Sequence, residues 1–198
     1  IQSVELKGNM RIIGDNAFSY CKQLSSVKIA DGLTTIGQGA FQYCESLKKI
    51  VLPDSVTTMK DLVFSSDKNL TTVRLSDNLT EIPSAAFTLC KSLVSINIPK
   101  KATAIKSSAF SSCEKLAAVV LPEGLTSIAK EAFYNTALEH IIIPSTVTTI
   151  GSDAFGSCDN LEKIAVLNKN ASISKGTNQG TLGTLGTTTV YAYSGSTA

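Results

Sequence analysis

The chain has 198 residues, of which 17% are charged, and its formal net charge is +2. This balance excludes the strongly basic surface typical of nucleic-acid-binding domains, since the lysine pairs at 48–49 and 100–101 are too short to form a patch. No apolar run approaches the roughly 20 residues that a membrane-spanning helix needs.

The first residues already stand at strand positions, with Val4 and Leu6 two apart and no signal peptide before them. We therefore expect a fragment or a mature chain, whose compartment no targeting segment indicates.

One unit recurs along the whole chain. Its phenylalanine stands at Phe18, Phe41, Phe64, Phe87, Phe110, Phe133 and Phe155, so the interval is 23 residues five times and 22 once. Repeats of this length are typical of solenoids, in which each unit packs only on its neighbours. We predict a single domain.

The unit at 36–53 shows how one coil is built. Its apolar residues from Ile36 to Leu47 fall three or four apart, which predicts a short helical turn, and Ile50 and Leu52 fall two apart, which predicts a strand. A strand of this kind can pair only with its equivalent in the next coil. The prediction is an α/β repeat, a leucine-rich-repeat-like solenoid with one parallel β-sheet face and short helical turns on the opposite face. The paired inward positions are Val4/Leu6, Val27/Ile29, Ile50/Leu52, Val73/Leu75, Ile96/Ile98, Val119/Leu121, Ile141/Ile143 and Ile164/Val166.

Two further apolar columns follow the strands, and both are expected to stack in the core. The second of them is Ile13, Ile36, Met59, Ile82, Ile105, Ile128, Ile150 and Ile173. Asp15, Ser84, Ser107 and Ser152 stand three residues before a phenylalanine, where they resemble helix N-caps.

Two units depart from the pattern, and the array ends before the C-terminus. The third unit has Asp67 at the cysteine position, and the sixth is one residue shorter and carries Thr136 nearby. After Val166 the chain becomes rich in Gly, Thr and Asn. We predict a solenoid of about seven to eight coils over 1–167 and an irregular cap of the same domain over 168–198, in which 190–193 alternates as an edge strand would.

The repeated unit resembles a known family. The pattern L-x-x-I-x-L-P-x-x-V-x-x-I-x-x-x-A-F-x-x-C-x-x-L, clearest from Leu93 to Leu116, resembles the BspA-like leucine-rich repeat, and the ending from Thr189 to Ala198 is similar to the segment that closes many arrays of this family. The resemblance implies a leucine-rich-repeat solenoid displayed outside a bacterial cell, within a longer surface protein that adheres to host or matrix proteins. It brings no catalytic residue and no cofactor.

The five cysteines occupy one repeat position, so they stack in one column. Neighbouring coils lie about 4.8 Å apart, a Cα separation that a disulfide tolerates. Stacked side chains point the same way, however, whereas a disulfide needs its Cβ atoms turned toward each other. We interpret the column Cys21, Cys44, Cys90, Cys113 and Cys158 as free core thiols. A disulfide is the alternative, as is a metal site, which no C-x-x-C spacing supports.

An enzyme is disfavoured by the same register. His140, the single histidine, falls on the sheet face, while the cysteines fall in the other half of the coil, so a Cys–His pair is not expected. The chain has no G-x-S-x-G, P-loop or H-E-x-x-H motif. The phenylalanines are interpreted as a core column and not as an aromatic ligand stripe.

The outward positions of the strands are the candidate binding residues. They vary from coil to coil while the core does not, and in the C-terminal half they form an apolar patch, which is typical of an interaction site. The candidate residues are Val51, Arg74, Asn97, Ala118, Val120, His140, Ile142 and Ala165.

The resulting hypothesis is a non-enzymatic, extracellular, adhesin-like module that binds a host or matrix protein or a glycan through this face, with no metal or cofactor, no nucleic acid and no membrane-spanning segment. The alternative hypothesis is a structural spacer within a longer surface protein.

Overall fold

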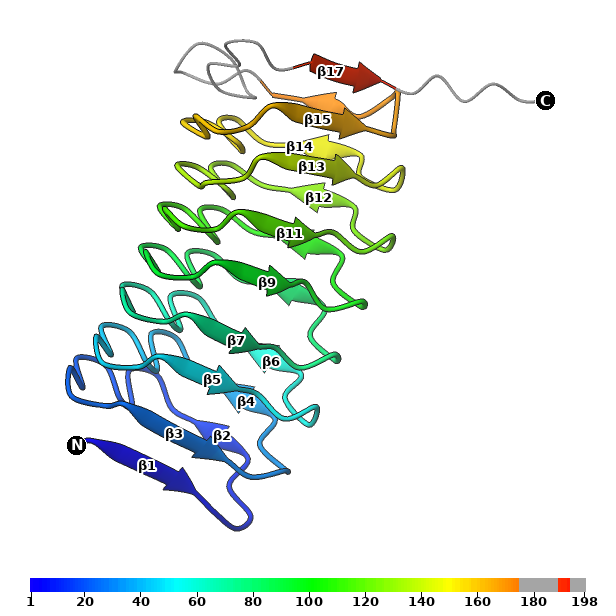
Figure 1. The fold of residues 1–198 in the computed structure, drawn as a ribbon. Helices are drawn as coiled ribbons and strands as arrows, with labels where there is room; N and C mark the ends of the chain where they lie inside the picture. Colours follow the sequence, from blue (N-terminus) through cyan, green and yellow to red (C-terminus); the bar gives the residue numbers. More distant parts are fainter. Residues whose placement is uncertain (175–188, 193–198) are drawn as a thin grey trace.

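The computed structural model describes residues 1–174 and 189–192, and within them every regular element is a β-strand. One long face of the solenoid carries the odd-numbered strands (Figure 1). They are β1 (Ser3–Leu6), β3 (Ser26–Ile29), β5 (Lys49–Val51), β7 (Thr72–Arg74), β9 (Ser95–Asn97), β11 (Ala118–Val120), β13 (His140–Ile143), β15 (Lys163–Val166) and β17 (Thr189–Ala192). We call this the first face.

A second row of strands, each of two residues, lies behind the first, where the sequence predicted only an apolar column. These strands are β2 (Ile12–Ile13), β4 (Thr35–Ile36), β6 (Thr58–Met59), β8 (Glu81–Ile82), β10 (Ala104–Ile105), β12 (Ser127–Ile128), β14 (Thr149–Ile150) and β16 (Ser172–Ile173). The prediction of one sheet face is therefore incomplete, because each coil contributes a strand to two faces.

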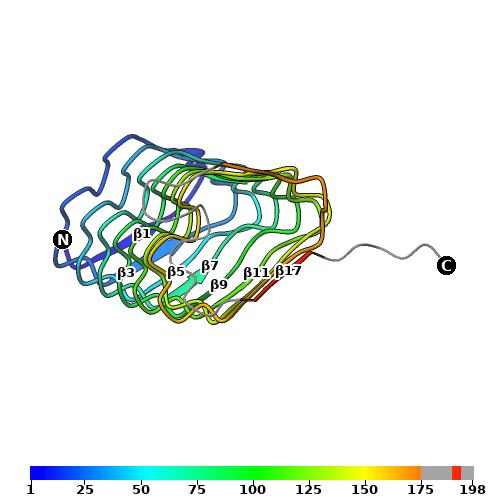
Figure 2. The same ribbon diagram turned by 90° about the horizontal axis from the view of Figure 1, so that it is seen from above.

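Equivalent residues of successive coils lie side by side. Ser3 pairs with Ser26, and Ile141 pairs with Ile164, always in parallel. Seen from above, the coils overlie one another with a gradual rotation (Figure 2). The register of the sequence repeat is thus also the register of strand pairing, and each repeat column becomes a row along the solenoid.

The predicted helical turns are wrong. In an α-helix each N–H bonds to the carbonyl four residues earlier, whereas here the bonds alternate between two other partners. The Phe41 N–H donates to the Val63 carbonyl of the next coil at 2.9 Å, and the Gln42 N–H donates to the Gly39 carbonyl three residues back at 3.0 Å. Tyr43 has a φ of 61°, which no right-handed helix contains. The segment is a series of tight turns.

The predicted helix caps are wrong for the same reason. Asp15 Oδ1 accepts the backbone N–H of Gln38 in the next coil, at 2.8 Å. The carbonyls of Ser84, Ser107 and Ser152 likewise accept N–H groups from the preceding coil. These positions link coils to each other and begin no helix.

The core is a set of side-chain columns. Six of the phenylalanines are fully buried, Phe18 is partly buried at the N-terminal end, and neighbouring rings stack, as Phe87 and Phe110 do with centroids 5.4 Å apart. The interpretation of these rings as core is confirmed. Their regular stacking leaves them no surface for a ligand.

The cysteine column lies beside the phenylalanines, and all five thiols are free, as interpreted from the sequence. The Cys90 Sγ donates to the Phe64 carbonyl at 3.1 Å, and the Cys113 Sγ donates to the Phe87 carbonyl at 3.1 Å. Burial raises the pKa of the Cys113 thiol. The four buried thiols, at Cys44, Cys90, Cys113 and Cys158, pack in the core.

The C-terminal part agrees with one sequence prediction. Strand β17 pairs in parallel with β15, so the edge strand is confirmed for 190–192, while Tyr193 lies outside the described residues. The boundary at residue 167 and the cap over 168–198 stay predictions. Across the described ranges, the solenoid contains no helix with the length and apolar character to cross a bilayer.

Candidate binding surface on the first face

The structure places the candidate residues on the first face, where the strand pleat turns them away from the core. Val120 and Ile142 are the most exposed of the apolar ones, at 71% and 64%. Ala165 is only half-buried, on β15 between β13 and β17. The exposed members are Val51, Arg74, Asn97, Ala118, Val120, His140 and Ile142.

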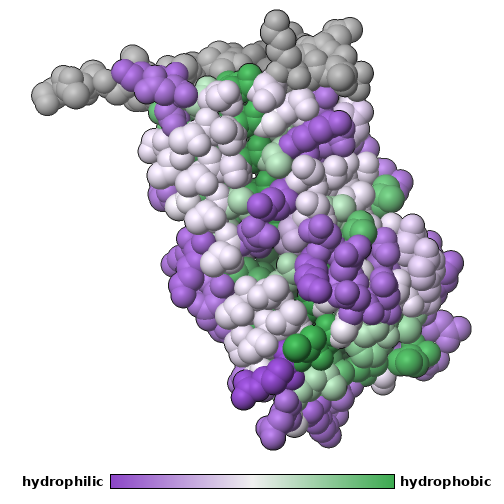
Figure 3. Space-filling model, turned by 180° about the vertical axis from the view of Figure 1, so that it is seen from behind, coloured by the Kyte–Doolittle hydropathy of each residue, from purple (hydrophilic) through white to green (hydrophobic). Residues whose placement is uncertain are grey.

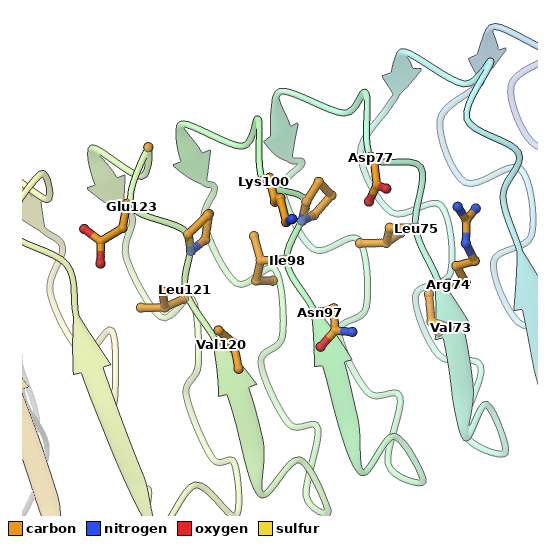
Figure 4. A pocket seen from close by; sticks show the side chains of 13 residues that line it. Val73, Arg74, Leu75, Asp77, Asn97, Ile98, Lys100, Val120, Leu121 and Glu123 are labelled. Carbon is orange, nitrogen blue, oxygen red and sulfur yellow. The ribbon is translucent and has the colours of Figure 1, made fainter.

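A hollow of about 830 Å³ lies where β7, β9 and β11 end and their following turns begin (Figure 4). We call it the central groove. Its floor is made by Leu75, Ile98 and Leu121, which keep 5%, 6% and 8% of their surface exposed. The equivalent Leu52 and Ile143 in the flanking coils are fully buried, while Leu6 and Ile29 at the N-terminal end are partly buried. The groove therefore exposes apolar core atoms that the flanking coils cover.

The Arg74 side chain leans away from this groove. Its Nη1 donates to the Leu52 carbonyl at 2.9 Å, and its Nη2 donates to both carboxylate oxygens of Asp54 at 3.1 and 2.9 Å. Both partners belong to the preceding coil, and Figure 4 shows Arg74 pointing away from Asn97. This ion pair leaves the space between β7 and β9 open.

The Arg74 guanidinium also lowers the pKa of Asp54, with a smaller contribution from the Asp77 N–H that donates to Asp54 at 3.1 Å. The carboxylate stays ionised and bound to Arg74 at neutral pH. The wall of the groove on the β7 side thus carries the ion pair of Arg74 and Asp54, whose two charges neutralise each other.

The rim of the central groove carries charges of both signs. Asp77, Lys100 and Glu123 stand on the turns after three successive strands, and Asn97 and Val120 line the strand side (Figure 4). An apolar floor with a few polar groups around it is the usual composition of a binding site.

Two smaller hollows continue the groove along the same face. One, of about 380 Å³, is lined by Val120, His140 and Ile142 over β11 and β13. We call Val120, Ile142, Ala118 and Ala165 the apolar patch. The other, of about 490 Å³, is lined by Lys28, Lys49 and Val51 over β3 and β5, and we call it the basic hollow.

Sequence reasoning missed the groove floor and the basic hollow. Leu75, Ile98 and Leu121 were assigned to the core, and nothing in their spacing separates them from Leu52. Lys28 and Lys49 could have been predicted, because both stand at outward strand positions like those of the candidate residues. They are 21 residues apart in the chain, and only the stacking of coils brings them to one hollow.

The structure brings His140 to the apolar side of this face and not to a cysteine. His140 is exposed at the start of β13, whereas Cys113 and Cys158 are buried in the turns. Within residues 1–174 and 189–192, no three His, Cys, Asp or Glu side chains gather in a way that could hold a metal ion.

Comparison with known proteins agrees with this architecture. The family model described as the BspA type leucine-rich repeat region, in six copies, matches residues 1–116 and 80–190. The chain belongs to the BspA-type leucine-rich repeat family. Leucine-rich repeat domains are protein-interaction modules, and neither this family nor its fold indicates a catalytic activity.

Among solved structures, this BspA-type protein is similar to a leucine-rich repeat protein from Bacteroides ovatus, with a TM-score of 0.74 and 25% identity over 97% of this chain. It spans 60% of that protein's chain. It is also similar to a leucine-rich repeat protein of T. pallidum, with a TM-score of 0.65 and 28% identity, covering 85% of this chain and 81% of the other.

The pneumococcal vaccine antigen PcpA has the same fold, with a TM-score of 0.50 and 22% identity over 88% of this chain and 53% of the other. A comparison with curated proteins found no match.

Proposed function

We propose that this BspA-type protein is a non-enzymatic, extracellular interaction module that binds a host or matrix partner, a protein or a glycan, through the first face. The observation that carries the proposal is the central groove, which shares Val120, Leu121 and Glu123 with the hollow beside exposed Ile142. The basic hollow lies on the same face. A monomeric protein seldom leaves such an apolar groove and patch open to water without using them for binding.

The second face is less suited to this role. Threonines just before its strands use their hydroxyls within the solenoid, as Thr126 does when its Oγ1 donates to the Thr103 carbonyl at 2.8 Å. Seen from behind, this side is covered mainly by residues of intermediate hydropathy and by hydrophilic residues (Figure 3). It offers fewer apolar contacts to a partner.

An extracellular location is supported by family membership and by the solved relatives, which are bacterial leucine-rich repeat proteins, one of them a vaccine antigen with the same fold.

The test is binding of the purified protein to an array of host matrix proteins and glycans, beside the double variant Val120→Glu with Ile142→Glu. Two carboxylates in the apolar patch should reduce saturable binding at least tenfold, because a partner would have to desolvate them. Circular dichroism checks that the variant is folded.

The matched control is Ile12→Glu, which changes an equally exposed isoleucine on the second face, 62% exposed against 64% for Ile142. It should bind like the unmodified protein. Equal binding by the double variant would contradict the placement on the first face. Absence of saturable binding by every form would favour the alternative, a structural spacer that holds other domains away from the cell.

A further inference from the structure

The three hollows differ in charge, and this difference indicates what kind of partner fits them. Lys28 and Lys49 line the basic hollow, and Lys48 is exposed next to them. In the described part of the chain, no ion pair engages these three amines. Asp31 is the acidic side chain that lines the same hollow.

The other acidic groups near the basic hollow are already neutralised. Glu5 on β1 pairs with Lys7 at 3.2 Å, and Asp54 pairs with Arg74 at 2.9 Å. The excess of positive charge over β3 and β5 is therefore left for a ligand. The pair Lys48 and Lys49 is too short by itself to form a basic patch, but Lys28 joins it when the coils stack.

The opposite end of the first face has the reverse character. Glu123 lines both the central groove and the hollow over β11 and β13, and Glu139 is exposed just before β13. Lys163 begins β15 nearby. Between these charges, Val120 and Ile142 present bare apolar surface. An acidic ligand group would be attracted at the β3 end, whereas at the β13 end Glu123 and Glu139 oppose the attraction of Lys163, and this difference favours one orientation of the ligand.

The distance between the two ends can be compared with the length of an extended chain. Five coil steps separate β3 from β13, which is roughly 24 Å at about 4.8 Å per coil. An extended polypeptide advances about 3.3 Å per residue, so roughly seven residues cover this span.

We propose that the first face takes an extended polypeptide segment whose apolar side chains lie over Val120 and Ile142 and whose acidic side chains, about seven residues away, reach Lys28 and Lys49. The inference rests on the proposed function and deepens it. A sulfated polysaccharide would satisfy the lysines as well, but it has no apolar side chains to cover the patch and the floor of the central groove. A polypeptide satisfies both ends.

The probe is a set of fluorescein-labelled synthetic peptides with two leucines and three glutamates, joined by glycine-serine spacers of two, five or twelve residues and made in both chain directions. Anisotropy titration should show the tightest binding for the five-residue spacer in one direction. A two-residue spacer brings fewer of the glutamates to Lys28 and Lys49, and a twelve-residue spacer costs more chain entropy. A peptide with lysines in place of the glutamates should not bind.

Two variants of the protein locate the ends of the peptide. Lys28→Glu with Lys49→Glu should weaken binding of the five-residue-spacer peptide about tenfold and remove most of its dependence on salt. The control is Lys60→Glu with Lys130→Glu, the same charge change after strands of the second face, which should leave binding unchanged. Val120→Glu with Ile142→Glu should weaken the same peptide.

The outcomes separate this inference from the proposed function. Binding to the matrix array could be lost in Val120→Glu with Ile142→Glu and kept in Lys28→Glu with Lys49→Glu, while no peptide binds. In that case the proposed acidic polypeptide is wrong, and binding through the first face is still supported. If a heparin oligosaccharide binds through the lysines and no peptide does, the ligand is a sulfated glycan and the inference is overturned. Spacer-independent peptide binding would also overturn it.

Discussion

Asp67 occupies a cysteine position and is fully buried between the thiols of the neighbouring coils. Its Oδ1 accepts the Cys44 N–H at 2.7 Å, and its Oδ2 has no hydrogen-bond partner. Burial raises the pKa of Asp67 to about 9, although the Cys44 N–H opposes the shift. At neutral pH the Asp67 carboxyl is protonated, so this position holds a neutral side chain, as it does in the five coils that have a cysteine there.

This raised pKa makes stability depend on pH. The unfolded chain binds the Asp67 proton only below about pH 4, so the folded state holds more protons between about pH 4 and pH 9. The stabilisation is therefore complete below pH 4 and is lost as pH rises toward 9, by up to about 1 kcal/mol for each pH unit. Urea unfolding at pH 5 and pH 8.5 should show the loss in the unmodified protein.

Asp67→Asn is the matching variant, since the amide keeps an acceptor for Cys44 and cannot ionise. Its free energy of unfolding should change less between the two pH values, while the exposed control Asp77→Asn keeps the original slope. Equal slopes for Asp67→Asn and the unmodified protein would show that Asp67 does not ionise in this window.

At the scale of the element, each coil is built from strands too short to be stable alone, and its stability comes from bonds to the next coil. The turns place residues such as Leu62 and Ser66 at φ values of 62° and 67°, in the left-handed region. Each such residue costs about 1 kcal/mol. In return the Leu62 N–H donates to the Ser84 carbonyl at 3.0 Å, and the Ser66 N–H donates to the Thr88 carbonyl at 2.7 Å.

Close stacking also restricts one glycine position. A Cβ on Gly37 would lie 2.5 Å from both the Asp15 nitrogen and the Gly14 carbonyl carbon, whereas a Cβ on Gly14 would meet nothing within 4 Å. Gly37→Ala should therefore destabilise the protein by about 1–3 kcal/mol. Gly14→Ala, at the same repeat position, should be neutral or stabilising by up to about 1 kcal/mol. Equal effects in thermal unfolding would argue against tight backbone contact at this turn.

At the scale of the whole molecule, stability is close to a sum over coils and their neighbour contacts. Because the repeat register is also the pairing register, one complete coil can be removed without changing how the rest stacks. The central groove, in contrast, needs three consecutive coils, since its floor takes one residue from each: Leu75, Ile98 and Leu121.

Deletion of residues 95–117, one 23-residue unit, should leave a folded solenoid of lower stability in which Phe87 stacks on Phe133. Circular dichroism should keep its β character, and urea unfolding should stay cooperative, while the spacer length that gives the tightest peptide binding should become shorter, because one coil fewer separates Lys49 from Val120. Deletion of residues 95–106 is the control, and it should not fold because half a coil breaks the register. A folded product from both deletions would contradict register-dependent stacking.

The array, the 23-residue register and the inward-facing residues could be predicted from the sequence alone. Fixed spacing places Phe110 and Cys113 in the core, and strand alternation turns Val120 and Ile142 outward. These properties follow from short stretches of chain. Apolar residues spaced three or four apart also predicted correctly which residues of the turns are buried, although the same spacing predicted a helix where the structure has tight turns.

The remaining features depend on tertiary structure, because the contacts that create them join residues 20 to 23 positions apart. The N–H of Phe41 bonds to the next coil and not along a helix, a choice that local periodicity does not contain. The second row of strands, the lean of Arg74 toward Asp54 and the meeting of Lys28 with Lys49 likewise arise only when coils stack. The pattern of one coil predicts burial, and the contact between coils creates the surface that a partner can use.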